Sequence, residues 1–141
     1  MIELVIIPGG EWRKEFLESA HKLAFNTEID AETERVDFGI LALKDNVPGG
    51  YMTCRELGRK ALYLQFGGVF PHEKQGFYVF QGYKMMLNWC LERYKTLETY
   101  IENTNTPMLK MAMKAGFLIT GTKLISERLL LHHVLEVKDA V

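Results

Sequence analysis

The sequence predicts a mixed α/β fold, because short apolar runs typical of strands alternate with stretches in which apolar residues recur at helical spacing. Two turn-rich segments, residues 45–50 and 58–60, join consecutive strand-like runs and predict antiparallel neighbours. Residues 106–115 form the clearest helix, with a proline in the first turn and a glycine after the end. The expected order is β-α-β-β-β-α-β-α-β-β, an α+β mixed sheet in a single domain over residues 1–141.

The first half of the chain supplies the hairpin strands. Residues 4–7 form a short β-branched run that Pro8-Gly9-Gly10 stops. A helix is expected from Trp12, with Phe16 and Leu23 near one face, followed by a polar loop over residues 26–34. Residues 36–43 and 51–57 predict a hairpin around the turn at residues 45–50.

The second half predicts a crossover between parallel strands. Residues 61–66 form a strand that Gly67-Gly68 interrupts, which suggests either a bulge or kink of the strand or a place where something approaches the backbone. Residues 78–94 carry apolar side chains at helical spacing and predict the long helix that covers the sheet. Strands are expected at residues 97–101, 117–125 and 129–137, which gives one βαβ unit and a closing hairpin.

Composition excludes several classes of protein. The 17 Lys and Arg residues balance 18 Asp and Glu residues, which disfavours a nucleic-acid binder that depends on a large positive field. Cys54 and Cys90 are the only cysteines and have no CxxC spacing, so neither a disulfide framework nor a thiolate zinc site is expected. The N-terminal apolar run is too short for a signal peptide or a membrane span, which favours a cytoplasmic protein without a membrane partner.

One segment resembles a known family. Asn105 is followed by an apolar helix that ends in Gly116-Phe117, and this pattern resembles a signature of the GNAT superfamily of N-acetyltransferases. Upstream, Val69-Phe70-Pro71 resembles the Val-x-Pro that opens the acetyl-CoA motif of that superfamily, and the element order along the whole chain also fits. The resemblance implies the acyl-CoA N-acyltransferase fold and acetyl-CoA as co-substrate. In general pattern the chain also resembles GNAT-like proteins carried by bacteriophages.

The resemblance also implies a cofactor site. Two neighbouring parallel strands are expected to part near Val69 and Asn105, so that the amides of pantetheine enter the wedge as a pseudo-strand. The pyrophosphate is expected at residues 74–79, where Lys74 precedes a helix N-terminus. Asn105 either binds the cofactor or holds the strands apart, and Gly116 ends its helix in a left-handed conformation. The predicted cofactor-binding residues are Val69, Phe70, Lys74, Gln75, Gly76, Phe77, Tyr78, Val79, Asn105 and Met108.

The sequence departs from the family pattern at the site. Phe77 and Val79 stand at the two glycine positions of the phosphate loop, so bulk replaces close approach of the backbone. The positions at which many relatives carry Glu and Tyr correspond to Gln65 and Ala112, which can neither accept nor donate the required proton. The residues assigned to catalysis in their place are Asn105, Tyr63, Tyr100 and Tyr78.

Several features have simple structural readings. One ring of His132-His133 is expected to face solvent and the other to be a hydrogen-bonded core residue, with no metal bound. Met108 and its neighbouring methionines are read as core filler. The leading functional hypothesis is acetyl transfer from acetyl-CoA to a primary amine in a ternary complex. The alternative is a non-catalytic GNAT-like binding or assembly module, and a homodimer is left open.

Overall fold

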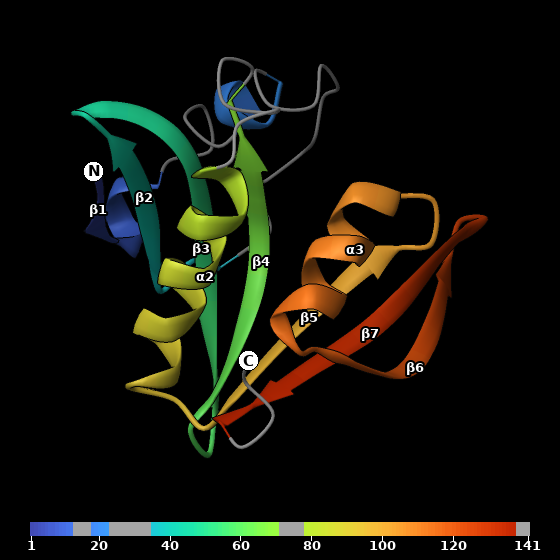
Figure 1. Ribbon diagram of the computed structural model, residues 1–141. Coiled ribbons are helices and arrows are strands. Elements are labelled where there is room, and N and C mark those ends of the chain that lie inside the picture. Colours follow the sequence, from blue (N-terminus) through green and yellow to red (C-terminus); the bar gives the residue numbers. More distant parts are fainter. Residues whose placement is uncertain (13–17, 23–34, 71–77, 138–141) are drawn as a thin grey trace. The chain divides into compact units, whose positions relative to one another are not determined.

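The computed structural model describes residues 1–12, 18–22, 35–70 and 78–137. The predicted order of strands and of the two later helices is confirmed (Figure 1). Most of the helix expected from Trp12 falls outside the described residues. The part of it that the structure describes, residues 18–22, is helical. The elements are β1 (Ile2–Pro8), the 3-10 helix η1 (Gly9–Glu11), β2 (Phe38–Lys44), β3 (Val47–Gly58), β4 (Ala61–Val69), α2 (Tyr78–Leu91), β5 (Thr96–Glu102), α3 (Thr106–Ala115), β6 (Leu118–Ile125) and β7 (Arg128–Glu136).

Hydrogen bonding orders the seven strands as β1-β2-β3-β4-β5-β7-β6. β4 pairs with β5 in parallel, as the predicted βαβ crossover requires, whereas β1–β2, β2–β3, β5–β7 and β6–β7 are antiparallel. The chain divides into two compact units. The first contains residues 1–55 and 64–87, and the second contains residues 56–63 and 88–141. The boundaries fall within β3, β4 and α2.

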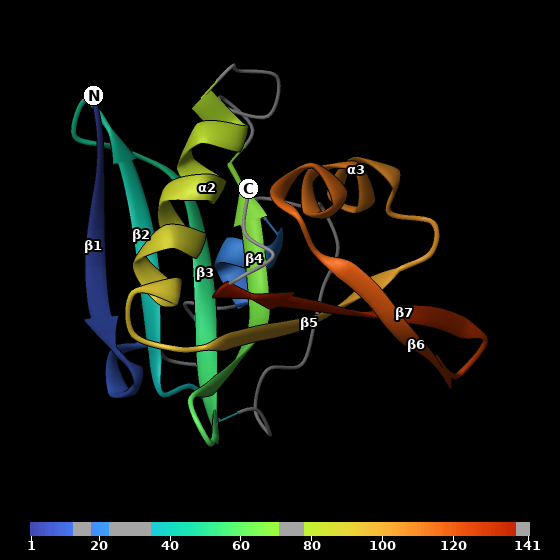
Figure 2. The ribbon, with the colours of Figure 1, turned by 60° about the horizontal axis from the view of Figure 1, so that its bottom comes forward.

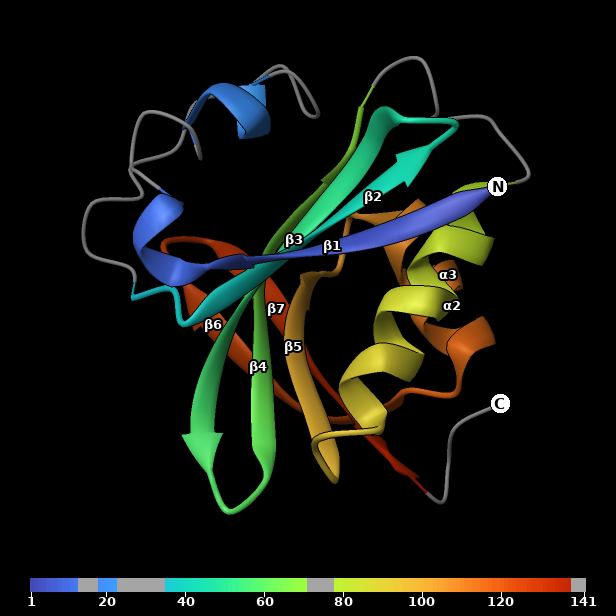
Figure 3. The same cartoon turned by 90° about the vertical axis from the view of Figure 1, so that its left-hand side faces the viewer.

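In the first unit, β1, β2 and β3 follow one another side by side (Figure 3). The β2–β3 turn is shorter than predicted, because only Asp45 and Asn46 lie between the paired residues Lys44 and Val47. Their φ angles of 52° and 67° match a two-residue type I′ turn, so residues 47–50 are free to join β3. The prediction of a turn over residues 45–50 is therefore wrong at its C-terminal end.

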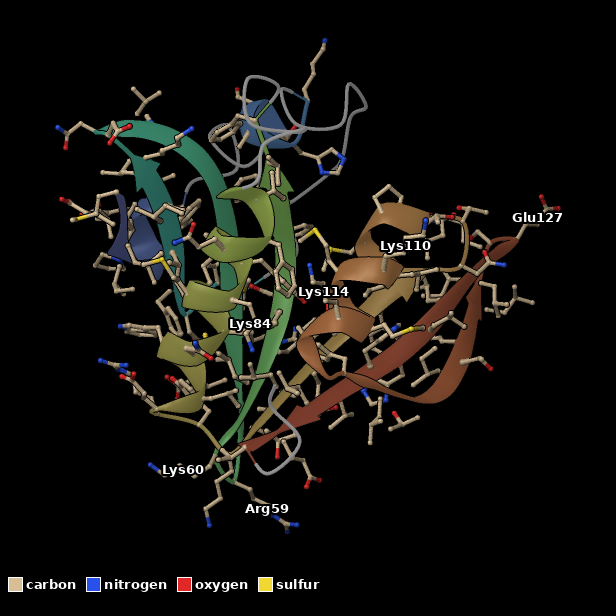
Figure 4. All side chains as sticks on the ribbon, viewed as in Figure 1. Arg59, Lys60, Lys84, Lys110, Lys114 and Glu127 are labelled. Atoms are coloured by element: carbon tan, nitrogen blue, oxygen red, sulfur yellow. The ribbon has the colours of Figure 1, made fainter. Side chains whose placement is uncertain are left out.

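The other two hairpins also close with two turn residues at positive φ. Arg59 and Lys60, at the β3–β4 turn, have φ angles of 53° and 63°, and Ser126 and Glu127 form the β6–β7 turn with 45° and 67°. Figure 4 labels Arg59 and Lys60 at the first of these turns and Glu127 at the second. Positive φ at both turn positions matches the twist of the flanking strands, which explains how turns without a central glycine close these hairpins.

The glycine pair does not interrupt β4, which continues to Val69, so that expectation is wrong. A Cβ atom added to Gly67 would lie 3.3 Å from the carbonyl oxygen of Tyr51, and one added to Gly50 would lie 3.0 Å from the carbonyl oxygen of Gly68. Glycine is therefore needed where β3 and β4 approach each other closely. The backbone that comes close belongs to β3 of the same unit.

An aromatic cluster forms the core of the first unit. The ring of Tyr51 stacks between Trp12 and Phe70, with centroid distances of 6.1 and 5.9 Å, and all three side chains are buried. The Trp12 indole donates a hydrogen bond to the carbonyl oxygen of Ile7 at 3.1 Å. Its ring fills the space that a side chain at Gly39 would occupy, 2.2 Å from a Cβ atom there. This packing fixes the end of β1 against β2 and β3.

In the second unit, α3 lies along one face of β5 and β7, with β6 beside β7 (Figure 2). Alternation along the strands separates two faces. The side chains buried on the helix side are Leu97, Ile101, Ala112, Ala115, Phe117, His133 and Leu135. Glu98, Tyr100 and His132 alternate with these residues and lie on the opposite face.

The long helix ends earlier than predicted. α2 begins at Tyr78, as expected, but stops at Leu91 rather than at residue 94. The backbone N–H groups of Arg93 and Tyr94 both donate to the carbonyl oxygen of Cys90, at 3.0 and 2.8 Å, so the chain closes in a tighter turn. α3 has the predicted bounds, residues 106–115.

Replacing Tyr51 by Phe is expected to stabilise the protein. In the described part of the chain the buried Tyr51 hydroxyl has no hydrogen-bond partner. Because an unsatisfied buried polar group costs about 1–3 kcal/mol, Tyr51→Phe is predicted to raise the free energy of unfolding in urea by about 1 kcal/mol. An unchanged or lower urea midpoint with the same m-value would contradict this account of the cluster.

The same substitution is expected to change alkaline stability. Burial raises the pKa of Tyr51 to about 12, above the value of about 10 for an unfolded chain. The neutral phenol is favoured in the folded state, so stability is complete below pH 10 and falls, by up to about 1.4 kcal/mol per pH unit, as the pH rises toward 12. Urea unfolding at pH 9 and pH 11 should show a smaller loss in Tyr51→Phe than in the wild type. An equal loss of unfolding free energy in the two proteins between pH 9 and pH 11 would contradict the raised pKa of Tyr51.

Candidate cofactor and acyl-transfer site

The first unit presents an open edge of β4. The Phe66 amide donates to Thr53 Oγ1 at 3.1 Å and the Phe70 amide donates to the Gly49 carbonyl oxygen at 2.9 Å, so both amides face β3. Because successive peptide groups of a strand point to opposite edges, the amides of Gln65, Gly67 and Val69 face away from β3. The open edge is defined here as the backbone groups of these last three residues.

The parallel ladder does not reach this edge. β4 and β5 pair through Ala61↔Thr96, Leu62↔Leu97 and Tyr63↔Glu98, all within the second unit. Within the described residues the ladder has no pair after Tyr63, although β4 continues to Val69. A short ladder followed by a longer strand leaves main-chain donors and acceptors for a ligand that carries amides. The wedge expected near Val69 and Asn105 involves one residue from each unit, and it stays a prediction.

Val69 and Phe70 differ in what they offer. Val69 is half-buried and its peptide group belongs to the open edge. Phe70 is 7% exposed, its ring stacks on Tyr51, and its amide is already bonded to Gly49. The predicted contribution of Phe70 to cofactor binding therefore finds no support in its buried ring or in its amide, which is bonded to β3.

The predicted phosphate loop falls largely outside the described residues. Lys74, Gln75, Gly76 and Phe77 belong to residues 71–77, which the structure does not describe. The helix that was expected to follow them is present and begins at Tyr78, with the half-buried Val79 in its first turn. The phosphate roles of residues 74–79 stay predictions.

Asn105 is the N-cap of α3. Its Oδ1 accepts a hydrogen bond from the Met108 amide at 3.3 Å, and Pro107 occupies the first turn. Gly116 ends the helix with φ of 103°, which confirms the predicted left-handed residue. Capping uses Oδ1, so the predicted cofactor role of Asn105 depends on the Nδ2 amide. The Met108 side chain is half-buried in the same turn.

Further along α3, two lysines occupy successive turns. Lys110 and Lys114 are both exposed and lie four positions apart on the helix (Figure 4). Side chains at this spacing project from neighbouring positions on one helix face.

Gln65 and Ala112 cannot supply an acid or a base. Gln65 Nε2 donates to the carbonyl oxygen of Arg35, and its buried Oε1 has no partner in the described residues. An amide has no proton-accepting group in the range of biological pH. Ala112 is fully buried in α3. If the protein transfers acyl groups, other side chains must handle the protons.

A polar and aromatic cluster lies on the second unit. Tyr63 and Tyr100, which the sequence analysis assigned to catalysis, meet edge to face with centroids 6.2 Å apart, and Tyr100 lies 4.9 Å from the His132 ring. His132 Nε2 is 2.9 Å from Glu98 Oε1, and His132 Nδ1 is 2.7 Å from Thr120 Oγ1. Nothing is described of the Tyr78 side chain, so its predicted role stays untested.

Sequence reasoning missed Glu98 and Thr120 in this cluster. Alternation places Glu98 and Tyr100 on one face of β5, which was a usable signal. The pairing of Tyr100 with His132 depends on the β5–β7 register. For the histidine pair the core position is confirmed, because His133 is 2% exposed and its Nδ1 lies 2.9 Å from the Leu131 carbonyl oxygen. His132 lies on the other face, but its side chain is only 24% exposed and both ring nitrogens have partners, so the expectation of a solvent-facing ring is wrong.

The described residues contain a further cavity and two cysteines. A cavity of about 460 Å³ is lined by Arg59, Lys60 and Arg93, at the opposite end of β4 from Val69. The described residues contain no group of three or more His, Cys, Asp or Glu side chains able to hold a metal. Cys54 and Cys90 are both buried, and they are not joined in a disulfide. None of the helices in the described ranges has the length and apolarity that crossing a membrane requires.

Solved structures share this fold. The chain is similar to an IAA acetyltransferase from Bacillus cereus, with 18% identity, 97% of this chain and 100% of the other covered, and a TM-score of 0.71. It is similar to the ribosomal-protein-S18-alanine N-acetyltransferase from Escherichia coli, with 10% identity, 97% and 94% covered, and a TM-score of 0.75. It is also similar to Arabidopsis thaliana NAA60 in complex with a bisubstrate analogue, with 11% identity, 99% and 100% covered, and a TM-score of 0.71.

These likenesses define the fold class. The chain has the GNAT acyl-CoA N-acyltransferase fold over nearly its whole length, as the sequence predicts. Comparison of the sequence with family models finds no match, and comparison with curated proteins finds none either. The likeness to proteins carried by bacteriophages stays an expectation.

Two substitutions separate the possible roles of Asn105. Asn105→Ser retains a side chain that caps α3 but removes Nδ2, whereas Asn105→Ala removes both. If Nδ2 binds the cofactor, both variants should weaken acetyl-CoA binding by titration calorimetry, about tenfold for one lost hydrogen bond. Only Asn105→Ala should also lower the free energy of unfolding, by about 1 kcal/mol. Wild-type affinity in Asn105→Ser would show that Asn105 only caps the helix.

Proposed function

We propose that this protein is an N-acetyltransferase that moves the acetyl group of acetyl-CoA to a primary amine by direct transfer in a ternary complex. Its fold is shared with proteins described as acetyltransferases, one of them solved with a bisubstrate analogue. A fold alone does not define an activity, so the proposal depends on the site.

The open edge of β4 is the observation that carries the proposal. The amides of Gln65, Gly67 and Val69 point away from β3, and the β4–β5 ladder has no pair after Tyr63 in the described residues. Pantetheine carries two secondary amides in an extended chain. It is therefore suited to add to this edge by main-chain hydrogen bonds, as an extended peptide adds to a sheet.

The other parts of the cofactor are proposed to bind at the first turns of α2 and α3. The pyrophosphate requires donors, and α2 begins at Tyr78, where unpaired backbone N–H groups and the helix dipole favour an anion. Lys74 and the amides of residues 75–79 are proposed to bind it. Asn105 Nδ2 and the Met108 side chain are proposed to contact the cofactor from the first turn of α3.

The reaction itself requires two proton transfers. The acceptor ammonium must lose a proton, after which its nitrogen attacks the thioester carbon, the C–N bond forms, the C–S bond breaks and the CoA thiolate takes up a proton. Alignment of two bound reactants supplies several kcal/mol of barrier lowering. Tyr63, Tyr78 and Tyr100 are proposed as proton donors to the thiolate, because Ala112 cannot act.

Binding and turnover test the proposal separately. Acetyl-CoA and free CoA at millimolar concentration are each predicted to raise the melting temperature. Release of CoA thiol, measured with a panel of primary amines that includes an alkylamine, a polyamine and a peptide with a free N-terminus, is predicted to depend on the amine. A shift with both ligands but no thiol release would favour a non-catalytic binding module. No shift with either ligand would contradict both functions.

A further inference from the structure

We propose that Glu98, His132 and Thr120 form a hydrogen-bonded chain in which His132 takes up the proton that the acceptor ammonium loses. Glu98 and Thr120 are positioning residues that hold the imidazole from its two sides. The inference rests on the proposed function and deepens it, because it supplies the proton acceptor that Gln65 cannot be.

The hydrogen-bonded chain from Glu98 to Thr120 crosses three neighbouring strands of the second unit. Glu98 comes from β5, His132 from β7 and Thr120 from β6, with distances of 2.9 Å from Oε1 to Nε2 and 2.7 Å from Oγ1 to Nδ1. Ile119 pairs with His133 and Gly121 pairs with His132, so Thr120 is the extra residue of a β-bulge. Such a bulge redirects a side chain, and here the Thr120 hydroxyl meets the His132 ring.

This arrangement suits an imidazole that alternates between two protonation states. In the neutral form, Nε2–H donates to the Glu98 carboxylate and Nδ1 accepts from the Thr120 hydroxyl. In the protonated form, Nδ1–H donates to Thr120 Oγ1 after the hydroxyl turns, and Nε2–H remains on Glu98. Neither state leaves a ring nitrogen without a partner, so uptake of a proton disrupts no hydrogen bond. The tautomers follow from these partners rather than from observed hydrogens.

The imidazole lies among charged and polar side chains. The side chains of His132 and Glu98 are 24% and 28% exposed, so their interaction is partly shielded from water. The charged groups nearby are Lys123, whose Nζ lies 5.4 Å from the centroid of the Tyr100 ring, and the Glu102–Arg128 pair at 3.2 Å. The rings of Tyr63 and Tyr100 lie on the same face.

Glu98 lies at the end of the described parallel ladder. It pairs with Tyr63, and the described residues contain no β4–β5 pair beyond this one. An imidazole exchanges protons readily near neutral pH, whereas the Gln65 amide does not. The His132 ring, next to Tyr100, is the described group on this face that is best suited to accept a proton.

The proposed proton transfer breaks one bond for each bond that it forms. One N–H bond of the ammonium breaks and a bond from that proton to His132 Nδ1 forms, directly or through the Thr120 hydroxyl, which passes its own proton on and receives the new one. The amine then carries the lone pair that attacks the thioester carbon. The imidazolium charge is held by the Glu98 carboxylate until the departing thiolate or solvent removes the proton.

The main test compares two amines in His132→Gln. With an alkylamine, which is protonated at pH 7, kcat/KM is expected to fall about 100-fold or more, the size of effect of a lost general base. With an O-alkylhydroxylamine, which is already neutral at that pH, the loss should be less than tenfold. The melting-temperature shift with acetyl-CoA should be that of the wild type, which shows that the variant is folded and binds the cofactor.

A matched pair of carboxylates tests the positioning role. Glu98→Gln removes the negative charge of the carboxylate that contacts His132 Nε2. Protonation of the imidazole should then be less favourable, so the acidic limb of the pH–kcat/KM profile should move to lower pH. Glu102→Gln removes a carboxylate of the same strand and face, paired with Arg128, and should leave the profile unchanged. NMR titration of the His132 ring in both variants provides the same comparison without turnover.

The outcomes separate this inference from the proposed function. Equal losses with both amines in His132→Gln, or an unchanged rate with either amine, would overturn the role of His132 while acetyl transfer by the wild type stands. A Glu98→Gln profile identical to that of Glu102→Gln would overturn the positioning role. If the wild type releases no thiol with any amine, the proposed function fails and this inference fails with it.

Discussion

The central physical constraint in this protein is the short parallel ladder between β4 and β5. Backbone donors and acceptors in a sheet interior need partners, and within the described residues the ladder supplies them from Ala61 to Tyr63 on β4 and no further. The remaining length of β4 is bonded to β3 on one edge, through Phe66 and Phe70. On its other edge the peptide groups of Gln65, Gly67 and Val69 are available for an extended ligand. A fold with this interruption is suited to an amide-bearing cofactor.

The packing of the first unit supports β4 from the side of β3. Gly50 and Gly67 permit an approach that a Cβ atom would prevent, and the stacked rings of Trp12, Tyr51 and Phe70 fix the end of the strand. The edge is therefore held in place by packing on the β3 side of the strand. The second unit carries the titratable groups on one face of β5 and β7.

The sequence predicted those features that depend on neighbouring residues. The bounds of α3 follow from a capping asparagine, a proline in the first turn and a terminal glycine, all of them local signals. The turn at residues 45–50 was predicted too long, because turn propensity does not show that Asp45 and Asn46 alone close the hairpin. The Glu98–His132 contact joins residues 34 positions apart through strand register, which local patterns do not encode. Tyr63 and Tyr100 were proposed because tyrosine can donate a proton, and that role stays a prediction, whereas a threonine at a bulge gave no signal.

The most direct measurement of the central claim is amide hydrogen exchange, resolved by NMR, with and without saturating acetyl-CoA. The amides of Gln65, Gly67 and Val69 are expected to exchange more slowly with the ligand, because pantetheine accepts hydrogen bonds at the open edge. The Phe66 and Phe70 amides, already bonded toward β3, are expected to change much less. Equal exchange at residues 65, 67 and 69 in the presence and absence of bound acetyl-CoA would contradict the account.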